Sequence, residues 1–417
     1  MKNNNIIRED NNCRMCKSNN IAVVIELMPT PPGDLFLPKD KLEFSSNKYP
    51  LNIALCNNCG YLYLPCVLSP KISYTNYVYE TKVTVGLSQH YIDYAIEIIG
   101  FGCIQPLSFV IDLGSNDGTM LKAFKEGGMK VLGVEPNENI ASIANQNNLN
   151  TINNYFSDDV SDRIIEDHGQ ATIITANYMY ANIDDLKGFT ENVKKVLHPD
   201  GLFVIQTGYH PEQMKVNMFD YIYHEHFSYF TVKVLKNFLA SCDMELINVS
   251  LHPAKGGSIR AIVQHSGGKR IVNPSVESFV AAEDQALMHD PITYLNFYNE
   301  INFCKDELLK LLKKVKSSGD HLIGYGASHS TTTLLHHFEM GKYFDYLVDD
   351  NPIKHNLYSP GYHLPVYHTE KLYKEKPNYV VVLGWQHQDS IIKRNKKYID
   401  DGGKFVIPLP KLKVISK

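Results

Sequence analysis

Two stretches of this chain each combine an apolar strand, a glycine turn and the start of a helix. The first is FVIDLGSNDGTML, residues 109–121, and the second is HLIGYGASHSTTTLL, residues 321–335. A glycine turn between a strand and a helix exposes backbone N–H groups, and such turns bind nucleotide-like ligands at the carboxyl edge of a parallel sheet. The chain has 417 residues, which is enough for two or three domains. We therefore expect an α/β protein with two nucleotide-type units.

The first of these units carries residues suited to a cofactor. Its loop reads D-x-G-x-x-x-G through Asp112, Gly114 and Gly118, and Asn116 stands where a dinucleotide fingerprint has its second glycine. Glu135 ends the next apolar strand, about 20 residues further on, where an acid suits a ribose diol. Because this loop is looser than one that binds a pyrophosphate, it favours a ligand without phosphates, such as S-adenosylmethionine.

The alternation of strands and helices continues beyond this loop. A strand begins at residue 171 and runs into a polar and aromatic loop, so Asn177 is expected to line the same crevice. A turn and strand follow at 197–208. The stretch LHPAKGGSIRAIVQ, residues 251–264, closes the unit; its paired glycines allow a ligand to approach the backbone, and Arg260 can meet an anion.

Four of the eight cysteines form two tight pairs, Cys13-x-x-Cys16 and Cys56-x-x-Cys59. Two such pairs suit a tetrahedral Zn²⁺ site that holds a small domain together. Gly60 follows the second pair and can take the positive φ that turns backbone amides toward thiolates. Redox pairs or disulfides are the alternative, but a cytoplasmic setting disfavours both. Since four cysteines leave no open position, the metal is expected to be structural rather than catalytic.

The segment FDYIYHEHFSYFT, residues 219–231, is unusually rich in groups that move protons. It contains three tyrosines, two histidines, a glutamate and an aspartate. The alternative is a half-buried strand in which the tyrosines pack and hydrogen bonds satisfy the histidines. If the segment forms a turn, Tyr223 and His226 share a face; if it is extended, His224 and His226 do.

The second unit is expected to hold a second ligand. The helix after its glycine turn begins with several hydroxyl side chains, and exposed amides there suit a phosphate. FDYLVDDNPIKHN, residues 344–356, resembles a second strand with acids at its tip. A further strand spans 379–387, where Trp385 is available to stack on a base or sugar. The alternative for this unit is a degenerate dimerisation module.

The remaining patterns predict local elements. Four prolines within residues 28–38 indicate an extended loop, and the tyrosine-rich stretch 74–82 reads as a lid or as plain packing. An amphipathic helix is expected over 87–99. Long helices are expected over 275–318, with a helical apolar stripe formed by Leu295, Tyr298, Ile301, Leu308 and Leu312.

The composition argues against two classes of partner. The formal net charge is −4 and the pI is about 6.5, so no basic field favours nucleic acid. No apolar run approaches the ~20 residues needed to span a bilayer, and the first residues lack the apolar core of a signal peptide. We expect a cytoplasmic protein.

Taken in order, these motifs resemble the sugar-nucleotide C-methyltransferase family. The resemblance rests on CxxC…CxxC, IDLGSNDGTML, FDYIYHEHFSYF, GGSIR and GYGASHSTTTLL with DDNPIKHN, and covers nearly the whole chain. It implies a zinc-binding domain over residues 1–70, a class I methyltransferase domain with a Rossmann-like fold over 71–270 and a second Rossmann-like domain, binding the sugar nucleotide, over 271–417. The family transfers a methyl group from S-adenosylmethionine to a carbon beside a ketone in a nucleoside-diphosphate deoxysugar.

The resemblance also implies roles for individual residues. It assigns proton handling to Tyr223, Glu225 and His226, and places Tyr79 near the reaction centre. On this basis His226 is expected to be the base, Tyr223 to assist it or donate to an enolate oxygen, and Glu225 to orient a histidine. S-adenosylmethionine is expected to contact Asp112, Gly114, Asn116, Gly118, Glu135 and Asn177.

Two positions depart from the family pattern, because Asn182 and Lys255 stand where the family usually carries histidines. Asn182 cannot act as a base, although it can hydrogen-bond a ketone or enolate oxygen. We expect the substrate side of the site to be formed by Asn182, Lys255, Arg260, Tyr325, Ser328 and Trp385.

Two other functions are compatible with the same motifs. An O- or N-methyltransferase acting on a sugar nucleotide would need a base only for a hydroxyl or an amine, and no solvent deuterium would enter a carbon position. A zinc-ribbon binding module fused to inactive Rossmann-like folds would not bind S-adenosylmethionine in a thermal-shift assay.

Overall fold

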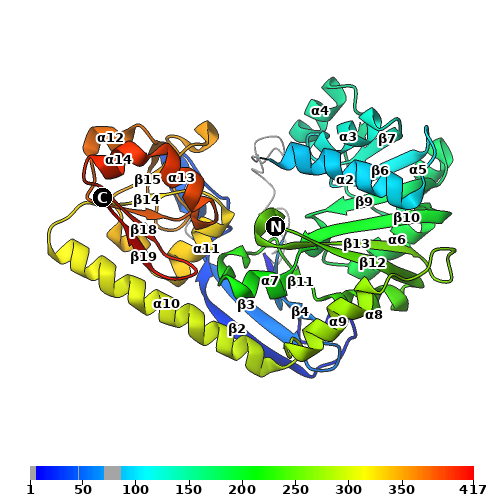
Figure 1. Cartoon of the computed structure of the whole chain (residues 1–417), viewed down its shortest axis with the longest axis horizontal. Coiled ribbons are helices and arrows are strands. Elements are labelled where there is room, and N and C mark those ends of the chain that lie inside the picture. The colour runs from blue at the N-terminus through cyan, green and yellow to red at the C-terminus, as the bar shows by residue number, and fades with distance from the viewer. Residues whose placement is uncertain (1–5, 46, 70–85) are drawn as a thin grey trace, which may run out of the picture.

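The computed structural model describes residues 6–45, 47–69 and 86–417 (Figure 1). It is built around three sheets and one small ribbon. The tyrosine-rich stretch 74–82, including Tyr79, lies outside the described residues. Within the described ranges, no helix combines the length and apolar character that crossing a membrane requires.

The N-terminal part is antiparallel. A two-stranded ribbon pairs β1 (Ile7–Glu9) with β5 (Cys66–Leu68). A four-stranded sheet follows the order β11-β4-β3-β2, with β2 (Ile21–Thr30), β3 (Tyr49–Cys56), β4 (Leu62–Tyr63) and β11 (Ser228–Tyr229). Its edge strand β11 belongs to residues 219–231, which we call the proton-handling segment. A piece of chain about 160 residues downstream of β4 therefore completes the N-terminal sheet.

The prediction of a loop over residues 28–38 was wrong at its start. Met28, Pro29 and Thr30 belong to β2, although a register irregularity separates Leu27 from Thr30. β2 lies at the edge of the sheet, so the missing N–H of Pro29 breaks no internal ladder.

The central part is a seven-stranded sheet in the order β12-β13-β10-β9-β6-β7-β8, in which only β13 runs antiparallel to the others. Strands β6, β7 and β8 extend the sheet in one direction, and β9 and β10 extend it in the other. Sheets of this kind bind ligands at such a switch point, which here lies between β6 and β9. The predicted strands at 109, 131, 171 and 197 are confirmed. The strands are β6 (Phe109–Leu113), β7 (Lys130–Val134), β8 (Thr151–Ile152), β9 (Ala171–Asn177), β10 (Leu197–Gly208), β12 (Met244–His252) and β13 (Ser258–His265).

Helices cover both faces of this sheet, because alternate strand residues point to opposite sides. Val110 and Val204 pack under one group of helices, and Ile111 and Ile205 under the other. The first group is α2 (Leu87–Gly102) and α3 (Thr119–Glu126), which confirms the helix predicted over 87–99. The second group is α5 (Asp158–His168), α6 (Leu186–Val196), α8 (Val232–Ser241) and α9 (Ser275–Gln285), while α4 (Glu138–Gln146) packs by β8 and α7 (His210–Lys215) follows β10.

The C-terminal part is a second α/β unit. Its six-stranded sheet follows the order β16-β15-β14-β17-β18-β19 and is parallel except for β19. The strands are β14 (Leu322–Tyr325), β15 (Leu347–Asp349), β16 (Val366–His368), β17 (Tyr379–Val382), β18 (Lys404–Ile407) and β19 (Lys413–Ile415). The helices are α10 (Pro291–Ser317), α11 (His329–His337), α12 (Lys371–Glu375), α13 (Gln388–Arg394) and α14 (Lys396–Asp400). The predicted strand–turn–helix opening at 321–335 is confirmed.

Helix α10 runs beneath the N-terminal sheet toward the C-terminal unit (Figure 1). Its buried stripe includes Ile301, Leu308 and Leu312, as predicted, but begins at Tyr294 and Phe297. The prediction for Leu295 was wrong: its side chain is exposed, because it lies one position beyond Tyr294 and therefore about 100° around the helix.

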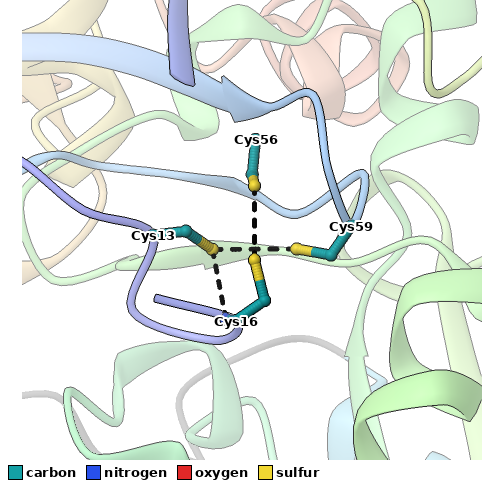
Figure 2. Close-up of side chains that lie close together, drawn as sticks. All are labelled: Cys13, Cys16, Cys56 and Cys59. Carbon is teal, nitrogen blue, oxygen red and sulfur yellow. Dashed lines mark hydrogen bonds between the residues drawn. The ribbon is translucent and has the colours of Figure 1, made fainter. Parts of the chain in front are cut away.

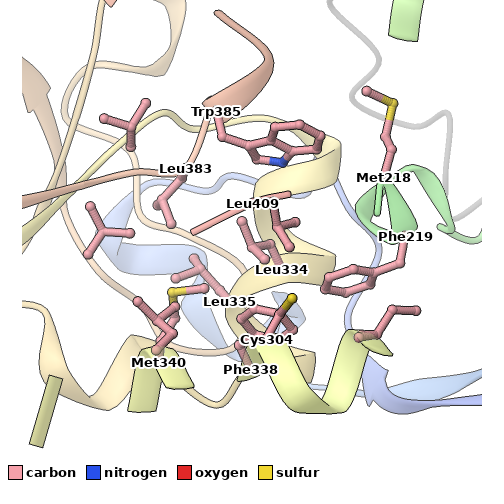
Figure 3. Packing of buried hydrophobic residues seen from close by; sticks show 14 of the residues in the cluster. Met218, Phe219, Cys304, Leu334, Leu335, Phe338, Met340, Leu383, Trp385 and Leu409 are labelled. Atoms are coloured by element: carbon pink, nitrogen blue, oxygen red, sulfur yellow. The ribbon is translucent and has the colours of Figure 1, made fainter. Parts of the chain in front are cut away.

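One continuous core joins the N-terminal sheet to the C-terminal unit. Figure 3 shows Phe219 of the proton-handling segment against Phe338, whose ring centroid is 5.0 Å away. Residues of β2, β3, α10 and α11 continue this cluster. Apolar burial of this kind contributes about 25 cal/mol per Å², so the two parts stabilise each other.

A buried histidine makes the stability of this fold depend on pH. His210 stacks on Tyr294 with 5.7 Å between ring centroids, and burial lowers the pKa of His210 to about 3. The unfolded chain binds a proton there below pH ~6.5 and the folded chain does not, so stability is lost as pH falls. At pH 5.5 this amounts to about 1.4 kcal/mol.

We therefore expect His210→Phe to reduce the drop in thermal midpoint between pH 7.5 and pH 5.5. The control is His198→Phe, whose side chain is exposed. Equal pH dependence in the wild type and His210→Phe would contradict the assignment.

Candidate active site and metal centre

The four paired cysteines converge in the N-terminal part, as Figure 2 shows. All four Sγ atoms lie within 4.8 Å of one another, with 3.7 Å between Cys13 and Cys59 and 3.5 Å between Cys16 and Cys56. Four thiolates around a tetrahedral Zn²⁺ would be about 3.8 Å apart, so the cluster has the size and donor set of a structural zinc site.

The loops around the cluster are shaped for thiolates. Gly60 takes φ +75 and its N–H donates to the Cys56 carbonyl, while the Cys16 N–H points at Cys13 Sγ at 3.5 Å. Contact with Cys59 lowers the pKa of Cys13 to about 5, and the same contact raises the pKa of Cys59. A divalent cation removes this competition, because it stabilises all four thiolates at once.

The predicted cofactor residues lie at the carboxyl ends of three adjacent strands. Asp112 on β6 accepts hydrogen bonds from Thr175 Oγ1 at 2.6 Å and from Asn177 Nδ2 at 3.2 Å, both on β9. Burial raises the pKa of Asp112 to about 7. Gly114 takes φ +68, and a Cβ there would lie 3.0 Å from Met179 Cγ.

Glu135 is fixed by backbone groups rather than by side chains. Its carboxylate accepts from the Asn116 N–H at 3.0 Å and the Asn137 N–H at 2.9 Å, and its pKa is raised by burial. Buried Ser115 Oγ and Asn177 Oδ1 have no hydrogen-bond partner among the described residues. This open glycine loop, with an anchored acid and unsatisfied polar atoms, fits the nucleoside and amino-acid groups of S-adenosylmethionine.

The proton-handling segment forms a turn. A 3₁₀ turn, η4 (Phe219–Tyr221), leads through residues 222–227 to β11. The His226 N–H donates to the Tyr223 carbonyl, and the two rings lie 4.0 Å apart between centroids. Of the two arrangements left open by the sequence, the turn is therefore the observed one.

His226 is oriented by backbone. Its Nδ1 lies 2.9 Å from the Tyr221 carbonyl oxygen, so Nδ1 carries the proton and Nε2 keeps the lone pair. Burial lowers the pKa of His226 to about 3, which keeps the imidazole neutral at pH 7. The ring is thus in the protonation state that a base requires.

Glu225 contacts a histidine of the C-terminal unit instead of His226. Its Oε1 lies 4.0 Å from Nε2 of His329, the first residue of α11, and its Oε2 has no hydrogen-bond partner among the described residues. Burial raises the pKa of Glu225, while His329 opposes that shift. On its other side His329 lies 3.7 Å from Asp34 Oδ1 and 5.2 Å from the Tyr223 ring. Sequence reasoning missed His329, although it lies within the second glycine-turn motif.

The structure corrects the expectation for Trp385. The indole is 4% exposed and packs in the shared core, and its Nε1 donates to Asp220 Oδ2 at 2.9 Å (Figure 3). Gln386 Nε2 donates to the same oxygen at 3.0 Å. Trp385 therefore anchors the proton-handling segment to the C-terminal unit and has no face on which a base can stack.

The expectation for Arg260 is corrected in the same way. Its side chain is 1% exposed, pairs with Glu97, and stacks 3.9 Å from the centroid of the Tyr94 ring. Its Nε donates to Gln206 Oε1 at 3.0 Å. A buried guanidinium paired in this way is part of the scaffold and is not directed at an anionic ligand.

The other predicted substrate residues lie in three places. Tyr325 ends β14, is buried, and donates to Asp350, whereas Ser328 caps α11 by accepting from the Thr331 N–H. Asn182 ends the turn η3 (Tyr180–Asn182) beyond β9 and is half-buried. Lys255 lies in η5 (Ala254–Gly256), with Nζ 4.1 Å from the centroid of the Tyr178 ring.

Three family models match the sequence in chain order. A putative zinc binding domain matches residues 13–74, a methyltransferase domain matches 101–249, and a C-methyltransferase C-terminal domain matches 253–410. C-methyltransferase NovU of Streptomyces niveus is 28% identical over 415 residues, which covers 99% of this chain and 98% of NovU.

Solved methyltransferase structures resemble part of the chain. An S-adenosylmethionine-dependent methyltransferase from Clostridium acetobutylicum is 12% identical, with a TM-score of 0.34, and the match covers 47% of this chain and 96% of that one. The 1,6-didemethyltoxoflavin-N1-methyltransferase of Burkholderia thailandensis is 16% identical, with a TM-score of 0.33, covering 42% and 78%.

The metal centre predicts a specific effect of ligand loss. We expect Cys56→Ser to lower the bound zinc and the thermal midpoint, because one of four ligands is removed. The matched control is Cys66→Ser, a buried thiol outside the cluster in the same part of the chain. Metal is measured by inductively coupled plasma mass spectrometry. A metal-free Cys56→Ser protein as stable as the wild type would refute the structural role.

The cofactor loop predicts a loss of affinity when Glu135 loses its charge. We expect Glu135→Gln to raise the Kd for S-adenosylmethionine about ten-fold, since a carboxylate accepts from ribose hydroxyls more strongly than an amide. Isothermal titration calorimetry measures this, with Glu126→Gln at the exposed end of α3 as control. Unchanged affinity in Glu135→Gln would remove Glu135 from the ribose site.

Proposed function

We propose that this chain, an S-adenosylmethionine-dependent C-methyltransferase, transfers the methyl group to a carbon beside a ketone in a nucleoside-diphosphate deoxysugar. The observation that carries the proposal is the Tyr223–His226 pair, in which burial keeps His226 neutral and a backbone carbonyl orients its ring. A carbon acceptor needs such a base, because carbon becomes nucleophilic only after it loses a proton.

Proton removal is assigned to His226 Nε2. The C–H bond beside the ketone breaks, the proton passes to Nε2, and the electron pair moves onto the ketone oxygen as an enolate. Tyr223 packs against the His226 ring, and its hydroxyl is assigned the role of donor to that oxygen. A well-placed donor of this kind contributes about 3 kcal/mol to the transition state. When bound, S-adenosylmethionine supplies an electrophilic methyl group for the enolate carbon.

The amide of Asn182 supports the same oxygen in this proposal. Asn182 lies shortly after β9, which ends at the expected cofactor residue Asn177, so it lies at the carboxyl edge of the sheet. An amide donates a hydrogen bond without exchanging a proton. His226 is therefore the only base in this proposal, since Asn182 stands where the family usually carries a histidine.

The C-terminal unit is assigned the nucleotide part of the acceptor. Asp349, at the tip of β15, accepts from the Ala327 N–H at 2.6 Å and the Asn351 N–H at 2.7 Å. This repeats the arrangement in which Glu135 accepts from the Asn116 and Asn137 N–H groups. An anchored acid at the tip of the second strand suits a ribose diol, so it favours a nucleoside at this unit as well. We place this reaction in the cytoplasm.

The test uses the full chain, S-adenosylmethionine and a panel of nucleotide-linked keto-deoxysugars in D₂O, read by mass spectrometry and NMR. We expect a methyl group on carbon, and deuterium at that carbon when the methyl donor is omitted. A methyl group on oxygen or nitrogen without exchange would sink the enolate mechanism and favour an O- or N-methyltransferase.

His226→Ala should lower kcat by at least about 10²-fold, the range for loss of a general base, and leave the Kd for S-adenosylmethionine unchanged. His265→Ala is the control, because His265 lies near the Leu197 carbonyl at the opposite edge of the sheet. Full turnover in His226→Ala would remove this residue from the mechanism.

A further inference from the structure

Two non-glycine residues with left-handed backbones meet at the carboxyl edge of the central sheet. Tyr178 has φ 55 and directly follows β9, and Lys255 has φ 52 and lies between β12 and β13. A bulky side chain rarely takes this conformation, because it is sterically unfavourable for any residue other than glycine. Such strain persists only where the surroundings impose it, and it gathers at functional sites.

The two side chains are in direct contact. Lys255 Nζ lies 4.1 Å from the centroid of the Tyr178 ring, within the range of a cation–π interaction. The ring is held from behind, because the Tyr178 hydroxyl accepts from Gln206 Nε2 at 2.7 Å and from Ser258 Oγ at 3.3 Å. Gln206 is fixed in turn by Arg260. The ring is therefore a rigid support for the ammonium group.

The backbone of Lys255 is tied to the proton-handling segment. Gly256 and Gly257 also have positive φ, 78 and 111, so three successive residues turn the chain. Met218, next to Phe219, fills the space beside Gly256, where a Cβ would lie 2.2 Å from its Cε. The turn that carries Lys255 therefore packs against the residue that precedes segment 219–231.

The positive charge of Lys255 affects the pKa of His226. Burial is the main cause of the low pKa of His226, and the positive charge of Lys255 lowers it further. Burial also lowers the pKa of Lys255, to about 8, so the ammonium form predominates at pH 7.

We propose that Lys255, held on the Tyr178 ring, is a catalytic residue whose ammonium group stabilises the acceptor oxygen that becomes negative when His226 removes the carbon-bound proton. This rests on the function proposed above. Lys255 forms no covalent bond and transfers no proton. The proton goes to His226 Nε2, and the electron pair rests on the oxygen opposite the ammonium until the carbon is methylated.

The role explains why strain is retained at residue 255. Glycine would adopt φ 52 without a steric penalty, so the lysine keeps a costly backbone in return for the position of its charge. It also gives a function to the lysine that stands before the glycine pair, one of the two departures from the family pattern.

The experiment measures deuterium exchange at the acceptor carbon without methyl donor, and kcat and acceptor KM with it. We expect Lys255→Met to lower exchange and kcat by about 10²-fold or more while KM changes less than about three-fold. Lys255→Arg should restore at least a tenth of the lost rate, because the charge returns. The kcat of Tyr178→Leu should be about ten-fold lower than that of Tyr178→Phe, because phenylalanine keeps the aromatic ring on which the ammonium group rests.

Lys255→Gly separates catalysis from structure. It removes both the strain and the charge, so we expect a higher thermal midpoint together with the low kcat of Lys255→Met. The control is Lys269→Met, an exposed lysine paired with Asp200, with wild-type kinetics expected. A merely structural lysine would instead lower the midpoint and kcat together in Lys255→Gly.

The outcomes distinguish this inference from the proposed function. Wild-type exchange that persists unchanged in Lys255→Met overturns the role of Lys255 alone. A Lys255→Met variant that loses only acceptor affinity also overturns it, because the charge would then act in binding. Absence of exchange in the wild type, with methylation on oxygen or nitrogen, overturns the enolate function on which the role depends.

Discussion

The candidate site depends on one segment, residues 219–231, that leaves the central unit and is held by both of the other parts of the protein. Its end forms β11 and pairs with β4 of the N-terminal sheet. Its start is held by the C-terminal unit, because Asp220 accepts from Trp385 and the Ile222 carbonyl accepts from Thr333 Oγ1 at 2.8 Å. The N-terminal part makes a second contact with the segment, since Arg14 donates to the Phe227 carbonyl at 2.7 Å. The segment therefore has its observed conformation only when all three parts are folded together.

Burial sets the charges at this site. Removing a group from water disfavours its charged form, so His226 is neutral while the buried carboxyl of Glu225 has a raised pKa. His329, which the C-terminal unit supplies at the start of α11, opposes the rise in the pKa of Glu225. The site is thus completed across an interface, and the shared apolar core around Phe219 and Phe338 keeps that interface closed.

Local patterns in the sequence were sufficient to predict several of the elements that surround the candidate site, because glycine turns, apolar periodicity and paired cysteines act over a few residues. Both strand–turn–helix units were predicted, and so was the cysteine cluster. Predictions that required the direction of a side chain were less successful. Arg260 and Trp385 look like ligand contacts in the sequence, yet both are buried and bonded to other side chains. Leu295 fits a helical stripe, but the stripe begins one residue earlier.

The sequence alone determined which chemistry is available: four thiols for zinc, a glycine loop with distant Glu135 for a cofactor, and a cluster of tyrosines and histidines. Tertiary structure alone decided how the tyrosines and histidines of that cluster are arranged. The turn that joins Tyr223 to His226 leads into β11, which pairs with a strand about 160 residues earlier. The contacts of His329 with Glu225, and of Lys255 with Tyr178, likewise join residues far apart in the chain. The first contact depends on how separate units pack and the second on how one unit folds, and no local periodicity encodes either.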